Sequence, residues 1–129
     1  MPFYQFTVPT GGATLRHKAE VAAAMTKVHA EVTGAPGAYV HCSFVEVPAE
    51  SIFVAGEPVS GPRMVGLIRE GRSPEVRGRL LHGLADAWCE ITGDRKEDVA
   101  VFLTEVPGAN VLEDGAVLPE AADDPGAIA

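Results

Sequence analysis

Several features are missing from this sequence, and each absence removes a class of protein. No apolar run approaches the roughly 18 residues that a membrane-spanning helix needs. The chain begins without the basic segment and apolar stretch of a secretory signal, so we expect a cytoplasmic protein. Cysteine occurs only as Cys42 and Cys89, without the paired spacing of a zinc site, and both are expected to be reduced thiols.

Positive charge is also scarce. The chain has 10 Lys and Arg against 18 Asp and Glu, a formal net charge of −8. This balance argues against nucleic acid or an acidic membrane surface as a partner. Part of the charge comes from residues 120–129, rich in Pro, Ala and Asp, which we predict to be a mobile tail. In so acidic a chain, clustered arginines become candidates for an anion site.

Sequence signatures of common catalytic machinery are absent as well. The chain contains no glycine-rich phosphate loop, no Ser/His/Asp order and no signature of a nucleophilic cysteine. The histidines His17, His41 and His82 have no metal-ligand spacing with one another. We therefore expect neither a metal nor a cofactor.

What the chain does contain is an internal repeat. The segment EVTG at residues 31–34 recurs as EITG at 90–93, and EVP at 46–48 recurs at 105–107. All seven positions are offset by 59, which indicates a duplicated unit.

Each copy of the repeat predicts a strand, a helix and a second strand. The strands are expected within residues 1–9, 39–47, 64–68 and 99–106, and the helices over 15–33 and from the Ser73 cap to Gly93. Right-handed crossovers make the two strands of each copy parallel. We therefore predict an α/β (α+β) fold, a four-stranded sheet with both helices on one face. The other face is also apolar and needs a partner, which favours an oligomer.

Two shorter features complete the predicted domain. Asp114-Gly115 separates two apolar runs and predicts a hairpin over residues 110–118, and residues 51–55 predict a short extra strand. We expect one domain over residues 1–119, with the βαβ copies at about 2–48 and 61–107, followed by the tail.

Pro2 is the first candidate functional residue. An initiator methionine before proline is commonly removed, which leaves Pro2 with a free secondary amine in place of an amide. A free amino terminus has a pKa of about 7.7–8.0, which burial and neighbouring cations lower toward the range suited to a general acid or base. The alternative is an ordinary proline at a frayed terminus.

Four other residues are candidates, each with a plainer alternative. Arg69 and Arg72 precede the Ser73 cap, where guanidinium groups and a helix N-terminus suit a small carboxylate, or both pair with surface acids. His29 lies on the buried stripe of the first helix, either as a core histidine or as a donor to a substrate oxygen. Glu113 precedes the hairpin turn, either solvated or holding a water.

Taken together, these features resemble the tautomerase superfamily, and more closely its cis-3-chloroacrylic acid dehalogenase group. The matching stretches are Pro2-Phe3-Tyr4, VHAEVTG around His29, GLIREGRS at residues 66–73 and EVPGANVLEDG at 105–115, within a likeness that covers about residues 2–119.

The resemblance implies a role for each candidate. Pro2 is the proton donor or base, His29, Arg69 and Arg72 bind and polarise a substrate carboxylate, and Glu113 positions a water. It also implies a homotrimer whose sheets face a common centre. Phe102 stands where the family's dehalogenases have a tyrosine that helps Glu to activate water. Its missing hydroxyl favours hydratase or tautomerase chemistry over dehalogenation. The alternative is a trimer that binds a carboxylate without catalysis.

Overall fold

The computed structural model describes residues 1–11 and 14–123. The elements follow the predicted order: β1 (Phe3–Pro9), α1 (Thr14–Thr33), β2 (His41–Val47), β3 (Phe53–Val54), β4 (Glu57–Pro58), β5 (Arg63–Arg69), α2 (Pro74–Thr92), β6 (Ala100–Val106), β7 (Leu112–Glu113) and β8 (Ala116–Val117). Three single turns of 3-10 helix stand between them, η1 (Gly37–Tyr39), η2 (Lys96–Asp98) and η3 (Gly108–Asn110), and a fourth, η4 (Ala121–Asp123), follows β8.

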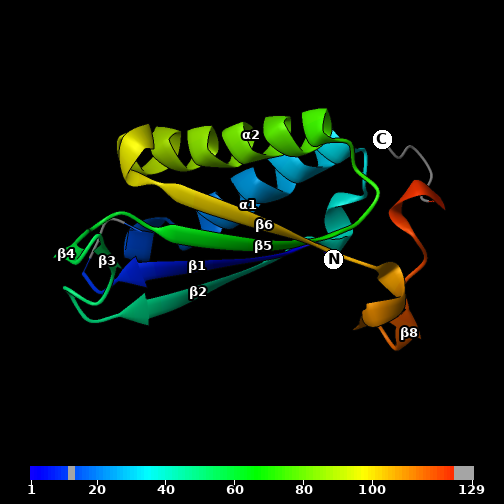
Figure 1. Ribbon diagram of the computed structural model, residues 1–129, viewed down its shortest axis with the longest axis horizontal. Helices are drawn as coiled ribbons and strands as arrows, with labels where there is room; N and C mark the ends of the chain where they lie inside the picture. The colour runs from blue at the N-terminus through cyan, green and yellow to red at the C-terminus, as the bar shows by residue number, and fades with distance from the viewer. Residues whose placement is uncertain (12–13, 124–129) are drawn as a thin grey trace.

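The four long strands form one sheet in the order β2-β1-β5-β6. β1 pairs with β2 and β5 with β6 in parallel, whereas the two halves meet at an antiparallel β1–β5 pair. Both helices pack side by side on one face of this sheet (Figure 1). The predicted α+β sheet with two helices on one face and a C-terminal hairpin is therefore confirmed.

The start and end of α2 follow from capping residues. The Ser73 hydroxyl accepts a hydrogen bond from the Val76 N–H at 3.1 Å, with Pro74 in the first turn. Gly93 ends the helix with a φ of 79°, a left-handed conformation that glycine adopts without steric cost. The buried stripe of α2 continues through Trp88, whereas Ala87 and Ile91 are only partly buried.

The core lies between the sheet and the helices. Tyr4, Phe6 and Val8 alternate along β1 toward the helices and are almost fully buried. The Phe6 ring stacks on Phe44 and Trp88, with centroid distances of 5.0 and 5.4 Å. Stacking of these three rings therefore packs β1 against its parallel neighbour β2 and against α2.

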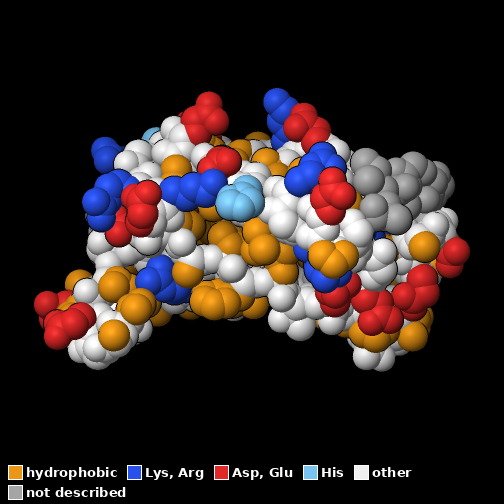
Figure 2. All heavy atoms as spheres, turned by 45° about the horizontal axis from the view of Figure 1, so that its top comes forward, with side chains coloured by type: hydrophobic (Ala, Val, Ile, Leu, Met, Phe, Trp, Pro, Cys, Tyr) orange, Lys and Arg blue, Asp and Glu red, His pale blue; other side chains and the backbone are white. Residues whose placement is uncertain are grey.

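The repeat extends further than the sequence motifs indicated, because each copy carries its own hairpin. The β3–β4 hairpin has the bounds of β7–β8 less 59 residues. Their turns are Ala55-Gly56 and Asp114-Gly115, and all four residues have positive φ. Asp-Gly is a strong sequence signal for such a turn and Ala-Gly is a weak one, so only the second hairpin was predicted. The two hairpins lie at opposite ends of the sheet, and β3–β4 projects from the body (Figures 1 and 2).

The sheet face away from the helices carries apolar side chains without a cover in the described chain. Val45 and Val65 are exposed there, and Phe102 on β6 is 57% exposed. An exposed apolar sheet face is typical of a surface that packs against another subunit. The prediction that this face needs a partner stays a prediction.

The end of the described chain packs on the body. Ala121 of η4 is buried, although the predicted tail began at residue 120. The rest of that tail, residues 124–129, lies outside the described residues. Within residues 1–11 and 14–123, no helix has the length and apolar character needed to cross a membrane.

Candidate active site

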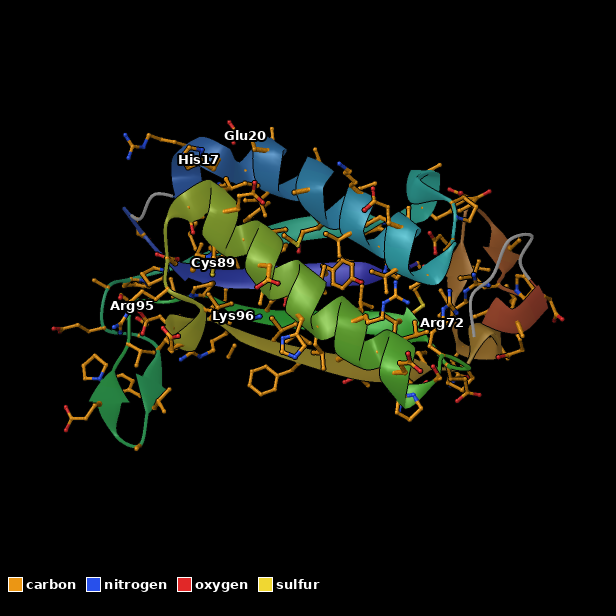
Figure 3. The ribbon with its side chains drawn as sticks, turned by 90° about the horizontal axis from the view of Figure 1, so that it is seen from above. His17, Glu20, Arg72, Cys89, Arg95 and Lys96 are labelled. Carbon is orange, nitrogen blue, oxygen red and sulfur yellow. The ribbon has the colours of Figure 1, made fainter. Side chains whose placement is uncertain are left out.

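The predicted site residues come to one end of the sheet. Because β1 and β5 are antiparallel, the amino terminus lies beside the end of β5 and the turn into α2. The β7–β8 hairpin lies at the same end (Figure 1). Figure 3 places Arg72 at the N-terminal end of α2, remote from His17 and Glu20 near the start of α1. Four chain segments therefore supply side chains to one region.

His29 is a buried, uncharged residue at this end. Its side chain is 3% exposed, and its Nδ1 lies 2.5 Å from the hydroxyl of Tyr4. Burial, then the positive charges of Arg72, the amino terminus and Arg69, lower the pKa of His29 to about 3. Burial likewise raises the pKa of the Tyr4 hydroxyl. Both groups are neutral near pH 7, so His29 offers one N–H donor.

Arg69 and Arg72 are both buried, which is unusual for arginine. Burial lowers the pKa of each, and the charge of Arg69 lowers that of Arg72 further. Arg69 Nη1 donates to the carbonyl of Pro119 at 2.9 Å. Arg72 Nε is buried without a hydrogen-bond acceptor among the described residues. Two desolvated cations side by side favour an anion between or beside them.

The amino group of the chain pairs with the Glu113 carboxylate. Met1 is 8% exposed and Pro2 is fully buried, so this terminus is part of the interior. Glu113 Oε1 also lies 2.8 Å from Nε2 of His41. Burial alone raises the pKa of Glu113, but hydrogen bonds from the amino group and from His41 outweigh it and leave the pKa below its usual value.

A cavity of about 460 Å³ opens beside these groups. Met1, Arg69 and Glu113 line it together with Tyr39 and residues 116–119 of the hairpin end. His29 and Arg72 are not among the residues that line it. Among residues 1–11 and 14–123, no cluster of His, Cys, Asp or Glu has the grouping to hold a metal ion.

Phe102 is the one predicted site residue that the chain does not bring to this region. It pairs with Val65, whereas Val106 at the end of the same strand pairs with Arg69. Four residues of strand separate Phe102 from the site, about 13 Å. Its side chain points to the open sheet face, so within one chain it contacts neither arginine.

Tyr4 and His41 belong to the site although the sequence interpretation missed both. Tyr4 lies two residues after Pro2, on the face of β1 that turns toward the helices. His41 opens β2 and pairs with Phe3. The predicted parallel pairing of the first two strands could have indicated His41, because in a parallel pair the start of one strand lies beside the start of the other.

Gly66 gives Tyr4 the room to reach His29. It is the register partner of Tyr4, and a Cβ added to it lies 2.7 Å from a Tyr4 ring carbon and 2.8 Å from Leu103 Cδ2. We expect Gly66→Ala to lower the free energy of unfolding by about 1–3 kcal/mol, because the ring has to shift within a packed core. Urea unfolding followed by fluorescence measures this change.

Gly78→Ala is the matched control. Gly78 lies within α2, and an added Cβ meets nothing within 4 Å. Alanine there is expected to stabilise the helix by up to about 1 kcal/mol. Equal stability of the Gly66→Ala chain and the wild type would contradict the close packing of Tyr4.

Comparison with known proteins identifies the family. Residues 1–127 match the family model described as "Putative oxalocrotonate tautomerase enzyme". No curated protein sequence matches the chain.

Solved structures give the same result. The structure of N1, a member of the cis-3-chloroacrylic acid dehalogenase family, is 26% identical with a TM-score of 0.87 and covers 95% of this chain and 92% of its own. The structure of Pt0534, inactivated by 2-oxo-3-pentynoate, is 26% identical with a TM-score of 0.81, covering 90% and 95%. A fused 4-OT, solved as a symmetric trimer, shares the fold at 24% identity and a TM-score of 0.83, covering 95% and 99%. The chain therefore belongs to the tautomerase superfamily, as its sequence motifs predicted.

Proposed function

We propose that this chain is an enzyme that transfers protons on a small carboxylate substrate. The amine of Pro2, free once Met1 is removed, is its general acid or base. The reaction is hydration or keto–enol tautomerisation of an unsaturated or 2-oxo acid. The observation that carries this function is the gathering of two buried arginines and a neutral histidine around the amino terminus.

The arginines bind the substrate carboxylate. A guanidinium group presents paired N–H donors whose geometry matches the two oxygens of a carboxylate. Arg72 has a buried Nε without an acceptor in the part of the chain that the structure describes, and a substrate oxygen supplies one. The N-terminal end of α2 lies next to Arg72, and the helix dipole adds positive potential there.

His29 stabilises the negative charge that develops on a substrate oxygen. The Tyr4 hydroxyl pairs with Nδ1. In the tautomer that we propose, Tyr4 is the donor of this hydrogen bond and the single hydrogen of the neutral imidazole lies on Nε2. A neutral N–H donor in a buried site suits an enolate-like oxygen, because water does not compete for the hydrogen bond there. Tyr4 is a positioning residue in this scheme.

Pro2 and Glu113 divide the proton transfers. In tautomerisation the neutral Pro2 amine takes the enol hydroxyl proton and returns a proton to the carbon. In hydration the oxygen of water bonds to one alkene or alkyne carbon and its proton passes to Glu113, while the protonated Pro2 donates to the neighbouring carbon. Removal of Met1 enlarges the existing cavity, because Met1 forms part of its wall.

The assembly that we propose is a cytoplasmic homotrimer. Packing the open sheet faces together covers Val65 and Phe102. It also puts Phe102 at a subunit interface instead of the pocket of its own chain. Dehalogenase activity is expected to be weak, because Phe102 has no hydroxyl to hold a water.

A carboxylate-binding module without catalysis is the second candidate. The buried Met1, whose amine pairs with Glu113, favours it, because a chain that keeps Met1 has an amide nitrogen at Pro2. The arginines bind a carboxylate in either case. The two candidates therefore differ in the chemistry of the amino terminus.

Treatment with 2-oxo-3-pentynoate tests the catalytic function. The Pro2 amine is expected to add to the alkyne, with a proton going to the neighbouring carbon, so that the whole mass of one reagent is gained per chain. Mass spectrometry of the intact chain and its N-terminal peptide measures both the loss of Met1 and the adduct. Ketonisation of phenylenolpyruvate is expected to disappear as the adduct forms.

Two variants control this experiment. Arg72→Ala is expected to slow labelling by about tenfold or more, because the reagent's carboxylate loses a charged hydrogen-bond donor. Arg95→Ala, at the other end of the molecule in Figure 3, is expected to label at the wild-type rate. A chain that retains Met1 and takes no label contradicts the catalytic function and leaves the binding module.

A further inference from the structure

His41 has a fixed position beside the amino terminus. It is the first residue of β2, and its backbone N–H donates to the carbonyl of Pro2 at 3.0 Å. Its ring lies against Phe3, with a centroid distance of 6.4 Å. Nε2 reaches across to Glu113 Oε1 at 2.8 Å. The side chain of His41 is 51% exposed, whereas that of Glu113 is 12% exposed.

The carboxylate of Glu113 depends on few donors. Among the described residues, its hydrogen bonds come from the amino group of Met1 and from His41. When Met1 is removed, His41 is the donor that remains at its present position. A largely buried carboxylate is costly to ionise without a hydrogen-bond donor. Stabilisation of the ionised Glu113 therefore depends more strongly on His41 once Met1 is gone.

Other charges around the pair come from three segments. Arg69 at the end of β5 faces Glu113, and Asp114 lines the same cavity from the hairpin. The amino group of Met1, just before β1, also faces Glu113. Arg69 already donates to Pro119 and is assigned to the substrate carboxylate, and Asp114 cannot donate when ionised. His41 is thus the donor of the group that is left to hold Glu113.

We propose that His41 is a positioning residue that determines whether the site hydrates its substrate. Its Nε2–H holds Oε1 of Glu113, which leaves Oε2 to receive the proton of the attacking water. This role rests on the proposed function of the same site. Tautomerisation needs no water, so it proceeds without His41. His41 therefore sets the ratio of hydration to tautomerisation.

Two variants and two reactions test this role. We expect His41→Leu to lower kcat for hydration of propiolate by about tenfold or more, because a misplaced water loses much of its reactivity. Ketonisation of phenylenolpyruvate is expected to stay within about twofold of wild type, since Pro2 and His29 are unchanged. His41→Gln keeps an N–H donor and is expected to restore part of the hydration rate.

The pH dependence distinguishes a positioning role from a merely structural one. His41 lowers the pKa of Glu113, so in His41→Leu the acidic limb of kcat for hydration is expected to move to higher pH. The carboxyl ¹³C resonance of Glu113 is expected to titrate at higher pH in the same variant. His17→Leu removes a histidine beside Glu20 at the far end of the molecule and is expected to change neither (Figure 3).

Two results would overturn the role of His41. One is a hydration rate, or a ratio of the two reactions, that does not change in His41→Leu. The other is an unchanged titration of the Glu113 carboxyl resonance, which needs no turnover and decides the question even in a chain without activity. A wild-type chain that catalyses neither reaction would count against the proposed function, whereas the resonance would still report on His41.

Discussion

A chain made to keep its initiator methionine is expected to lose at least about a hundredfold in ketonisation rate, the lower range of what a general acid or base contributes. Insertion of lysine between Met1 and Pro2 achieves this, because a large second residue blocks removal of the methionine. Pro2 then has an amide nitrogen, which neither accepts nor donates a proton near pH 7. The buried end of the chain also has to accommodate added residues where Met1 already fills space beside Glu113.

Intact mass must accompany every rate in this comparison. We expect the activity of wild-type preparations to scale with the fraction of chains that lack Met1. Circular dichroism and the elution volume in size-exclusion chromatography control for misfolding of the extended chain. An extended chain that folds, keeps its methionine by mass and ketonises at the wild-type rate would exclude Pro2 as the acid or base.

The sequence predicted the fold well because a repeat constrains many positions at once. Two short motifs at one offset fixed the separation of helix ends and strand ends, and handedness rules then determined the sheet. These motifs did not predict the β3–β4 hairpin. It repeats the backbone of β7–β8, but Val54 stands where the second hairpin has Glu113, so the side chains gave no match.

The candidate site was predicted in part, for a different reason. Arg69 and Glu113 are the last residues of their strands and Arg72 lies just before α2, and the ends of adjoining elements meet in space. Tyr4 and His41 act through the directions of side chains on paired strands, which depend on register. A register shift of one residue turns each side chain to the opposite face of the sheet. Composition and short motifs alone therefore do not identify Tyr4 and His41 as site residues. Phe102 shows the same dependence on side-chain direction. It lies on the predicted strand, but its side chain faces away from the pocket of its own chain.

Acid is expected to destabilise this protein through His29, and this second large effect has a defined pH window. The pKa of His29 is about 3 in the folded chain and about 6.5 when unfolded. Between these values the unfolded chain binds the proton that the folded chain excludes. The contribution of His29 is therefore fully present above about pH 6.5 and is lost as the pH falls toward 3.

The size of the effect follows from the width of that window. One pKa unit corresponds to 1.36 kcal/mol, so at pH 4 the loss is about 3 kcal/mol relative to pH 7. His29→Gln cannot be protonated, yet its amide oxygen accepts a hydrogen bond from Tyr4. We expect the variant to lose about 3 kcal/mol less than the wild type in urea unfolding at pH 4, at equal protomer concentration.

The comparison with His82→Gln isolates the buried position. His82 is exposed on α2, so its removal is expected to leave the pH dependence of the wild type unchanged. Carboxylates such as Glu113 add to the acid slope of every variant and cancel in the difference between variants. Identical slopes for wild type and His29→Gln would mean that His29 takes up a proton in the folded chain. A charged imidazolium would then face Arg69 and Arg72, and the neutral donor assigned to the substrate oxygen would not exist.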